Sequence, residues 1–318
     1  MIVPRWCYQL DESEKLLKNE LYRTWQKSIN DNQPELIETL IQEYDTELLF
    51  KLALTDPEFN TLCKSPNLEP HWVELWRLCG TNPREDAEKN HKPIQEYSPM
   101  LTVPSCFELL KGYYLYYTYT TLIESGGDLS AAEFEEAKEL LVASADCGCF
   151  FSMNVLCREG LSALKESVDD EITEFVLKYA TLAANLYLAP GYLLLGSVCQ
   201  ELMGYQDNAH WSSYPFVQMT FQAYTIAKHL EPISGPMLNN AYQGKTLKEA
   251  SNGAFSTFFE GQLRAQEYLM LNPIEIHHWS ILAKNEANII EARYMEEKRK
   301  LNQQNNDEKS EPPSYFRM

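Results

Sequence analysis

Apolar residues recur at positions i, i+3 and i+4 along most of this chain, which is the spacing of one face of an α-helix. Between Gln33 and Trp76 the apolar runs are short, so each helix predicted there is only about two or three turns long and must pack on its neighbours to be stable. After residue 105 the runs are longer. The pattern predicts an all-α fold, with helices over residues 11–29, 105–124, 130–146, 169–188, 246–272 and 273–300.

The polar stretches between these runs divide the chain. Residues 81–104 are polar and contain four prolines, which indicates a linker or long loop. Residues 1–80 before it are predicted to form one helical domain, and residues 105–300 after it a second one. Residues 301–318 are polar throughout, and their composition predicts a disordered tail.

The short apolar runs between Gln33 and Trp76 follow a recognisable order. Pro-Glu opens the stretch, Leu and Ile pairs follow, and an aromatic helix and a Trp close it. This order resembles an F-box, although Gln33 stands where that family has Leu and the closing segment is longer than usual. The matching residues are Pro34, Glu35, Leu36, Ile37, Leu40, Leu49, Leu52, Ala53, Leu54, Phe59, Leu62 and Trp76.

The F-box resemblance implies a binding partner. F-box domains dock on a Skp1-like subunit of a ubiquitin ligase, so the resemblance implies that this chain binds such a subunit through its N-terminal domain. The docking residues that it implies are Pro34, Ile37, Leu40, Leu49, Leu52 and Phe59.

Small residues recur in the second predicted domain. Alanines at 145, 184 and 227 are spaced by about 40 residues, a period that fits stacked helix pairs. Residues 134–156 and 175–198 resemble degenerate Sel1-like or tetratricopeptide-like repeats. The resemblance implies an antiparallel helix-pair solenoid that holds a target protein.

Charge and composition limit the classes of binding partner that this chain is expected to have. The net charge of −19 argues against nucleic acid and anionic membranes, since both attract Lys and Arg clusters. The sequence contains no run of about 18 apolar residues, so we expect no membrane span. The N-terminus has no signal-peptide pattern. The eight cysteines are scattered through apolar helical pattern, so we expect reduced, buried thiols and a cytoplasmic location.

Candidate chemistry is sparse. The sequence contains no Gly-rich phosphate loop, Gly-x-Ser-x-Gly or His-Glu-x-x-His motif. Cys147 and Cys149 form the only close cysteine pair, without a second pair at zinc spacing. We therefore predict no catalytic residues, no metal site and no cofactor. Tyr113, Tyr116 and Tyr117 share one helical face, which predicts core packing or, alternatively, an aromatic groove for a peptide.

The tail carries two weak signals. Pro312, Pro313 and Tyr315 form a Pro-Pro-x-Tyr motif, which resembles the polyproline ligand of WW domains. The acidic pairs at 296–297 and 307–308, together with Phe316, resemble the C-terminal signal of type IV secreted bacterial effectors.

These features lead to three hypotheses. The first is a non-enzymatic adaptor that joins a Skp1-like ubiquitin-ligase subunit to a target protein, as an effector that a bacterium secretes into the host cytosol. The alternative is a helical-repeat scaffold that binds a protein and has no ubiquitin link. The third is an enzyme of unknown type. Burial of residues 34–54 against residues after 105 would favour the scaffold, because a docking face must be exposed.

Overall fold

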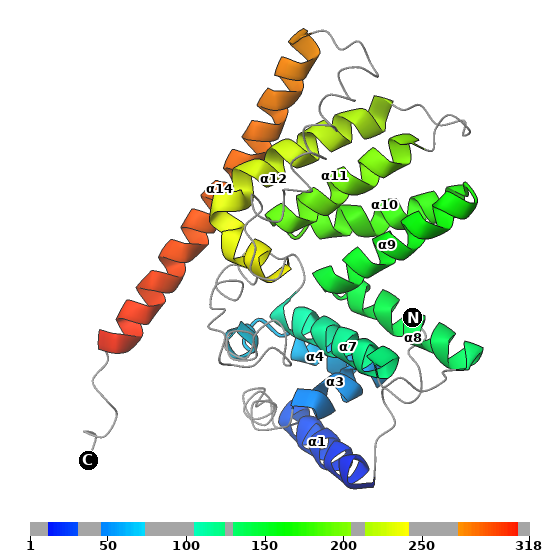
Figure 1. Ribbon diagram of the computed structural model, residues 1–318. Helices are drawn as coiled ribbons and strands as arrows, with labels where there is room; N and C mark the ends of the chain where they lie inside the picture. Colours follow the sequence, from blue (N-terminus) through cyan, green and yellow to red (C-terminus); the bar gives the residue numbers. More distant parts are fainter. Residues whose placement is uncertain are drawn as a thin grey trace. The chain divides into compact units, whose positions relative to one another are not determined.

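The computed structural model describes residues 12–30, 46–73, 105–124, 130–204, 214–241 and 273–310. All regular secondary structure in these ranges is helical, so the predicted all-α class is confirmed (Figure 1). The chain forms two compact units. Unit 1 comprises Met1–Pro83 and Pro104–Leu156, and unit 2 comprises Arg84–Val103 and Cys157–Met318.

Unit 1 contains two short helices between longer ones. Local sequence fixes several of their ends: the Asp56 side chain accepts hydrogen bonds from the amides of Glu58 and Phe59, and Pro57 occupies the first turn, where its missing N–H costs nothing. Ser130 and Glu133 form a capping box at the start of the helix that follows them. The described helices are α1 (Glu12–Asn30), α3 (Thr46–Thr55), α4 (Pro57–Cys63), α7 (Cys106–Glu124), α8 (Ala131–Asp146) and the beginning of α9 (Phe150–Glu166).

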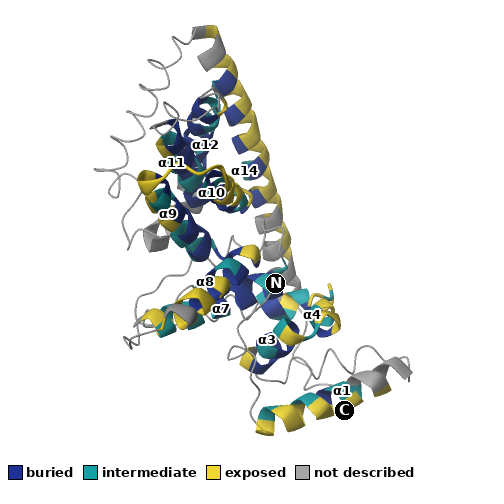
Figure 2. Ribbon diagram, turned by 90° about the vertical axis from the view of Figure 1, so that its right-hand side faces the viewer, coloured by how far each residue is buried: buried dark blue, intermediate teal, exposed yellow. Residues whose placement is uncertain are grey.

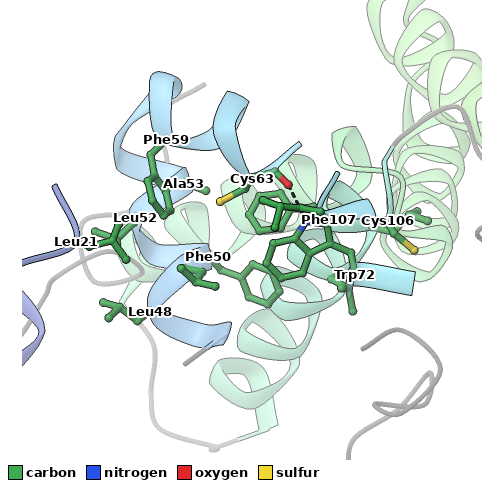
Figure 3. Packing of buried hydrophobic residues seen from close by; sticks show 14 residues of the cluster. Leu21, Leu48, Phe50, Leu52, Ala53, Phe59, Cys63, Trp72, Cys106 and Phe107 are labelled. Atoms are coloured by element: carbon green, nitrogen blue, oxygen red, sulfur yellow. Dashed lines mark hydrogen bonds between the residues drawn. The ribbon is translucent and has the colours of Figure 1, made fainter. Parts of the chain in front are cut away.

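One hydrophobic core joins the short helices to α7 (Figure 3). Trp72 is fully buried in this core, and its indole N–H donates a hydrogen bond of 2.7 Å to the Cys63 carbonyl. The Trp72 ring lies 4.9 Å from the ring of Phe107, at the start of α7. Because Phe107, Leu109 and Leu110 complete this core, α7 belongs with the N-terminal helices. The predicted division at residues 81–104 therefore does not coincide with the compact units.

Unit 2 stacks its helices in chain order, with α10 packed on α11, α11 on α12, and α12 on α14 (Figure 1). The approach is closest where glycine faces a neighbour. A Cβ atom added at Gly191 would lie 2.0 Å from the Ala183 carbonyl oxygen, and one at Gly196 would lie 2.6 Å from the Tyr224 ring. The described helices are α10 (Asp170–Ala184), α11 (Ala189–Gly204), α12 (Tyr214–Ala241) and α14 (Pro273–Ser310).

The last helix is longer than predicted. It begins at Pro273 as expected, but it continues through Lys300 to Ser310. The prediction that residues 301–310 are disordered was therefore wrong. Leu301, Gln303 and Glu308 are among several good helix formers there, and a helix that already exists is extended without a new nucleation cost. Residues 311–318 lie outside the described residues.

Candidate functional site

Part of the predicted docking face is buried in the core of unit 1. Leu49, Leu52 and Phe59 are 1%, 0% and 0% exposed and belong to its core (Figure 3). The other predicted docking residues, Pro34, Ile37 and Leu40, lie outside the described residues, as do the tail residues Pro312, Pro313 and Tyr315.

The neighbours of these side chains explain their burial. Phe50 packs against two aromatic side chains of α7, with its ring centroid 5.6 Å from that of Phe107 and 5.4 Å from that of Tyr114. α3 and α4 are too short to be stable alone, so their apolar face is used to complete the core. A partner could reach Leu49, Leu52 or Phe59 only if the core opened.

Polar contacts hold α1 against α3 and α4. Tyr22 donates a hydrogen bond to the Asp56 carboxylate, and Lys51 bridges Glu14 at 2.7 Å and Glu47 at 3.2 Å. Burial tends to raise the pKa of Asp56, but hydrogen bonds from the Tyr22 hydroxyl and from backbone amides lower it. Asp56 therefore caps α4 as a carboxylate and fixes α1 at the same time.

A charged network lies between α4 and α7. Lys111, only 5% exposed, contacts Glu108 at 2.9 Å and donates to Asn60 at 2.7 Å. Lys64 lies 3.2 Å from the other oxygen of Glu108. Burial tends to raise the pKa of Glu108, whereas the positive charge and hydrogen bond of Lys111 lower it below its usual value. Because every charge has an opposite partner, the arrangement joins the two helices and resembles a structural ion cluster.

The thiols next to this network are unreactive. Burial raises the pKa of Cys147 to about 12, although Lys111 acts in the opposite direction. Burial also raises the pKa of Cys63. Both groups therefore stay protonated at neutral pH, and a protonated thiol is a poor nucleophile and metal ligand. No group of three or more His, Cys, Asp or Glu side chains in the described ranges could hold a metal ion.

The tyrosine face of α7 is divided between core and surface. Tyr113 and Tyr116 pack on Phe151, with ring centroids 5.9 Å and 5.6 Å from it. Tyr117 is exposed. Two of the three tyrosines thus contribute mainly to packing between α7 and α9, and one reaches solvent.

A second set of surface residues was missed by sequence reasoning. α14 exposes Ile281, Leu282, Ile289 and Met295, and exposed residues recur along this helix (Figure 2). The sequence predicted this helix but no exposed apolar face on it. When apolar residues lie on two faces of one helix, the sequence loses a clear period of 3.6 residues. The pattern therefore does not show that the outer face is apolar as well.

Comparison with known proteins places the chain in a family. A family model with the description "Family of unknown function (DUF5630)" matches residues 37–264. The chain belongs to this family. The DUF5630 match covers unit 1 from residue 37 onward and unit 2 through α12 to residue 264, so both units carry family sequence. No curated protein matches the chain.

Solved structures share the fold of this DUF5630 protein. Uncharacterised protein lpg1670 has 22% identity and a TM-score of 0.65, over 88% of this chain and 99% of that chain. MesI (Lpg2505) from Legionella pneumophila has 20% identity and a TM-score of 0.58, over 85% of this chain and 96% of that chain. A second structure, of a Legionella pneumophila effector Lpg2505, has 20% identity and a TM-score of 0.54, over 79% and 89% of the two chains.

These similarities show that the fold occurs in bacterial effector proteins. Neither the matched family nor these similar structures are described as F-box or Sel1-repeat proteins. Within the described residues, no helix is long and apolar enough to cross a membrane.

Proposed function

We propose that this protein is a non-enzymatic scaffold of the bacterial effector type, which binds a partner protein through the outer faces of its packed helices. The observation that carries this proposal is the burial of Leu49, Leu52 and Phe59 in the core of unit 1. The described half of the predicted docking face is used for folding. Binding then depends on other surfaces, and helix stacks commonly provide broad ones.

Large apolar residues on the outer faces support this proposal. Tyr117 on α7, Phe134 on α8 and Phe175 on α10 are each more than a third exposed. Aromatic side chains supply much of the binding energy of protein interfaces. The negative charge of the whole chain favours a partner with a basic surface, because complementary charge speeds association.

The effector assignment rests on the shared fold and on the tail. MesI and the Lpg2505 effector have the same fold as this chain. The acidic, polar C-terminus fits delivery through a type IV secretion system into the host cytosol.

Photocrosslinking tests the scaffold. A photoreactive amino acid at Tyr117 or Phe175 in the full chain, expressed in host cells, should capture a protein that the purified chain then binds saturably. A photoreactive residue at buried Leu140 is the matched control and should capture nothing. If no captured protein binds the purified chain saturably in isothermal titration, the scaffold proposal fails.

The adaptor function is a separate proposal with a separate test. It now rests on Pro34, Ile37 and Leu40 alone. We expect purified Skp1 not to bind the full chain. If Skp1 binds, and Pro34→Ala with Leu40→Asp abolishes binding while Leu16→Asp on exposed α1 does not, the ubiquitin link is restored and the scaffold without it is wrong.

A further inference from the structure

α14 has two apolar faces, and among the described residues of unit 2 only one of them is packed against another helix. The inner face packs on α12, where Trp279 lies 6.1 Å from Phe221 between ring centroids. It is anchored by a hydrogen bond of 2.9 Å from the Tyr192 hydroxyl to Glu286. The buried residues of the inner face are Trp279, Ala283, Ala287, Ile290 and Tyr294.

The outer face lies on the opposite side of the same helix. At about 100° per residue, Ile281 lies about 200° and Met295 about 160° from Trp279. Ile289, at about 280°, and Leu282, at about 300°, lie along one flank of that side. Ile281, Leu282, Ile289 and Met295 are 43%, 42%, 57% and 46% exposed. An exposed apolar stripe of this kind marks an interaction surface more often than an isolated apolar residue does.

Two asparagines interrupt this stripe. Asn285 and Asn288 are exposed on the same side as Ile281 and Ile289. In paired helices, an asparagine within an apolar seam sets the register, because it is satisfied only when a polar group of the other helix lies opposite. The outer face thus has the composition of a helix–helix seam with a defined register.

We propose that the outer face of α14 is a homodimer surface, on which α14 of a second copy packs antiparallel. In this register Asn285 lies opposite Asn288 of the second copy, and Leu282 lies opposite Ile289. A two-fold axis repeats each contact, as in most homodimers. The inner face points away from the seam, so both copies keep their packing on α12.

The charges beside the seam favour the antiparallel arrangement. Lys284 is exposed on one flank, and Glu291 lies one heptad later on the same flank, 3.1 Å from His229. In antiparallel pairing Lys284 lies near Glu291 of the second copy, twice by symmetry. In parallel pairing Glu291 would lie near Glu296 of the second copy, and like charges repel.

The dimer should be weak. The seam from Ile281 to Met295 is about 21 Å long, so it buries less than a standard interface of about 1,600 Å². We expect a dissociation constant on the order of 10 µM. This inference goes beyond the scaffold function and does not depend on it.

Sedimentation equilibrium of the full chain tests the dimer. We expect a monomer–dimer equilibrium that Leu282→Glu with Ile289→Glu shifts to monomer. Circular dichroism and melting temperature should be unchanged, because both side chains are exposed and neither belongs to the buried core. The matched control is Phe175→Glu, an exposed aromatic on α10, which should leave the equilibrium unchanged. A wild-type chain that stays monomeric at about ten times the expected dissociation constant overturns the proposal.

Charge reversal tests the orientation. Lys284→Glu should weaken the dimer roughly tenfold, and Lys284→Glu with Glu291→Lys should restore it. If the double variant is as weak as the single one, the antiparallel register is wrong.

Thiol labelling of Ile289→Cys separates the two ways in which the dimer proposal can fail. Rapid labelling of a monomer would show a free face, whereas slow labelling would show that the chain's own residues 242–272, which lie outside the described part, cover it. Both results contradict the dimer. Labelling that slows as the protein concentration rises supports it.

Discussion

Unit 1 and unit 2 bury their helices in two different ways. Unit 1 fills the space between short helices with large side chains, such as Trp72 and Phe107, and adds a charged network around Lys111. Unit 2 brings longer helices together at small residues, such as Gly191 and Gly196. A short helix offers few contacts, so each one must be large. A long helix offers many, so its backbone can approach its neighbour closely.

This difference bears on function. In unit 1 the apolar face of α3 and α4 is needed to hold the short helices together, and little of it is left for a partner. In unit 2 one face of α14 is sufficient for packing, and the other keeps apolar residues at the surface. Partner binding through α14 therefore does not compete with folding, whereas binding through Leu49 or Phe59 would.

The largest expected effect is on the core of unit 1. Trp72→Ala removes a fully buried indole and its hydrogen bond to the Cys63 carbonyl. We expect a loss of about 4 kcal/mol in the free energy of unfolding, because the cavity adds to the lost burial. Urea denaturation measures it. Trp72→Phe should cost less, since the ring is retained, and equal costs for both variants would contradict the packing role of Trp72.

In unit 2 the sensitive position is a glycine. Gly191→Ala would place a Cβ atom 2.0 Å from the Ala183 carbonyl oxygen. This oxygen belongs to the backbone of α10, which cannot move aside as a flexible side chain could. We expect a destabilisation of about 3 kcal/mol, at the upper end for overpacking. Gly196→Ala meets the Tyr224 side chain at 2.6 Å instead of backbone and should cost less. Since alanine normally stabilises a helix by about 1 kcal/mol over glycine, a stabilised Gly191→Ala protein would disprove the close approach.

The charged network of unit 1 should have an intermediate effect. Lys111→Met leaves Glu108 half-enclosed without its main partner, and we expect a loss of about 2 kcal/mol at pH 7. Lys111→Met with Glu108→Leu should recover part of this loss, because the unpaired charge is then gone. If the double variant is less stable than the single one, the network is not a compensated ion pair.

The pH dependence of this network has a definite sign. The pKa of Glu108 is lower in the folded chain than its ordinary value of about 4.3. Its contribution to stability is therefore complete above that ordinary value and is lost as the pH falls through the folded pKa. The stability difference between wild type and Glu108→Gln should be largest at neutral pH and should shrink on acidification. A difference that is independent of pH would contradict the ionised state of Glu108.

The sequence was sufficient to predict most local structure. The ends of α1, α7 and α8 lie within one residue of the predicted ranges, because capping groups such as Ser130 and Glu133 act within a single turn. An amphipathic pattern shows that a face is buried but not what covers it. For this reason the apolar face at Leu49 and Leu52 resembled a docking surface, although α7 residues more than 50 positions later help to cover it.

The turn between α10 and α11 was also beyond prediction. Nothing in the sequence suggests that Tyr187 adopts φ 58°, a left-handed conformation that is uncommon for a bulky residue. The turn is shaped by contacts with α14, which is about 100 residues away in the chain. Such long-range contacts can override a local preference without leaving a local signal.

The smallest expected effect concerns this turn. Tyr187→Asn should relieve about 1 kcal/mol of backbone strain. It also removes the ring over which the Arg293 guanidinium lies at 5.7 Å, and such a cation–π contact is worth about 0.5–1 kcal/mol. The net change should be close to zero, so a double-mutant cycle is needed to resolve the two terms. Arg293→Ala should destabilise the wild type and leave Tyr187→Asn unaffected. If Arg293→Ala has the same cost in both backgrounds, the ring contact does not contribute and the strain at Tyr187 is compensated elsewhere in unit 2.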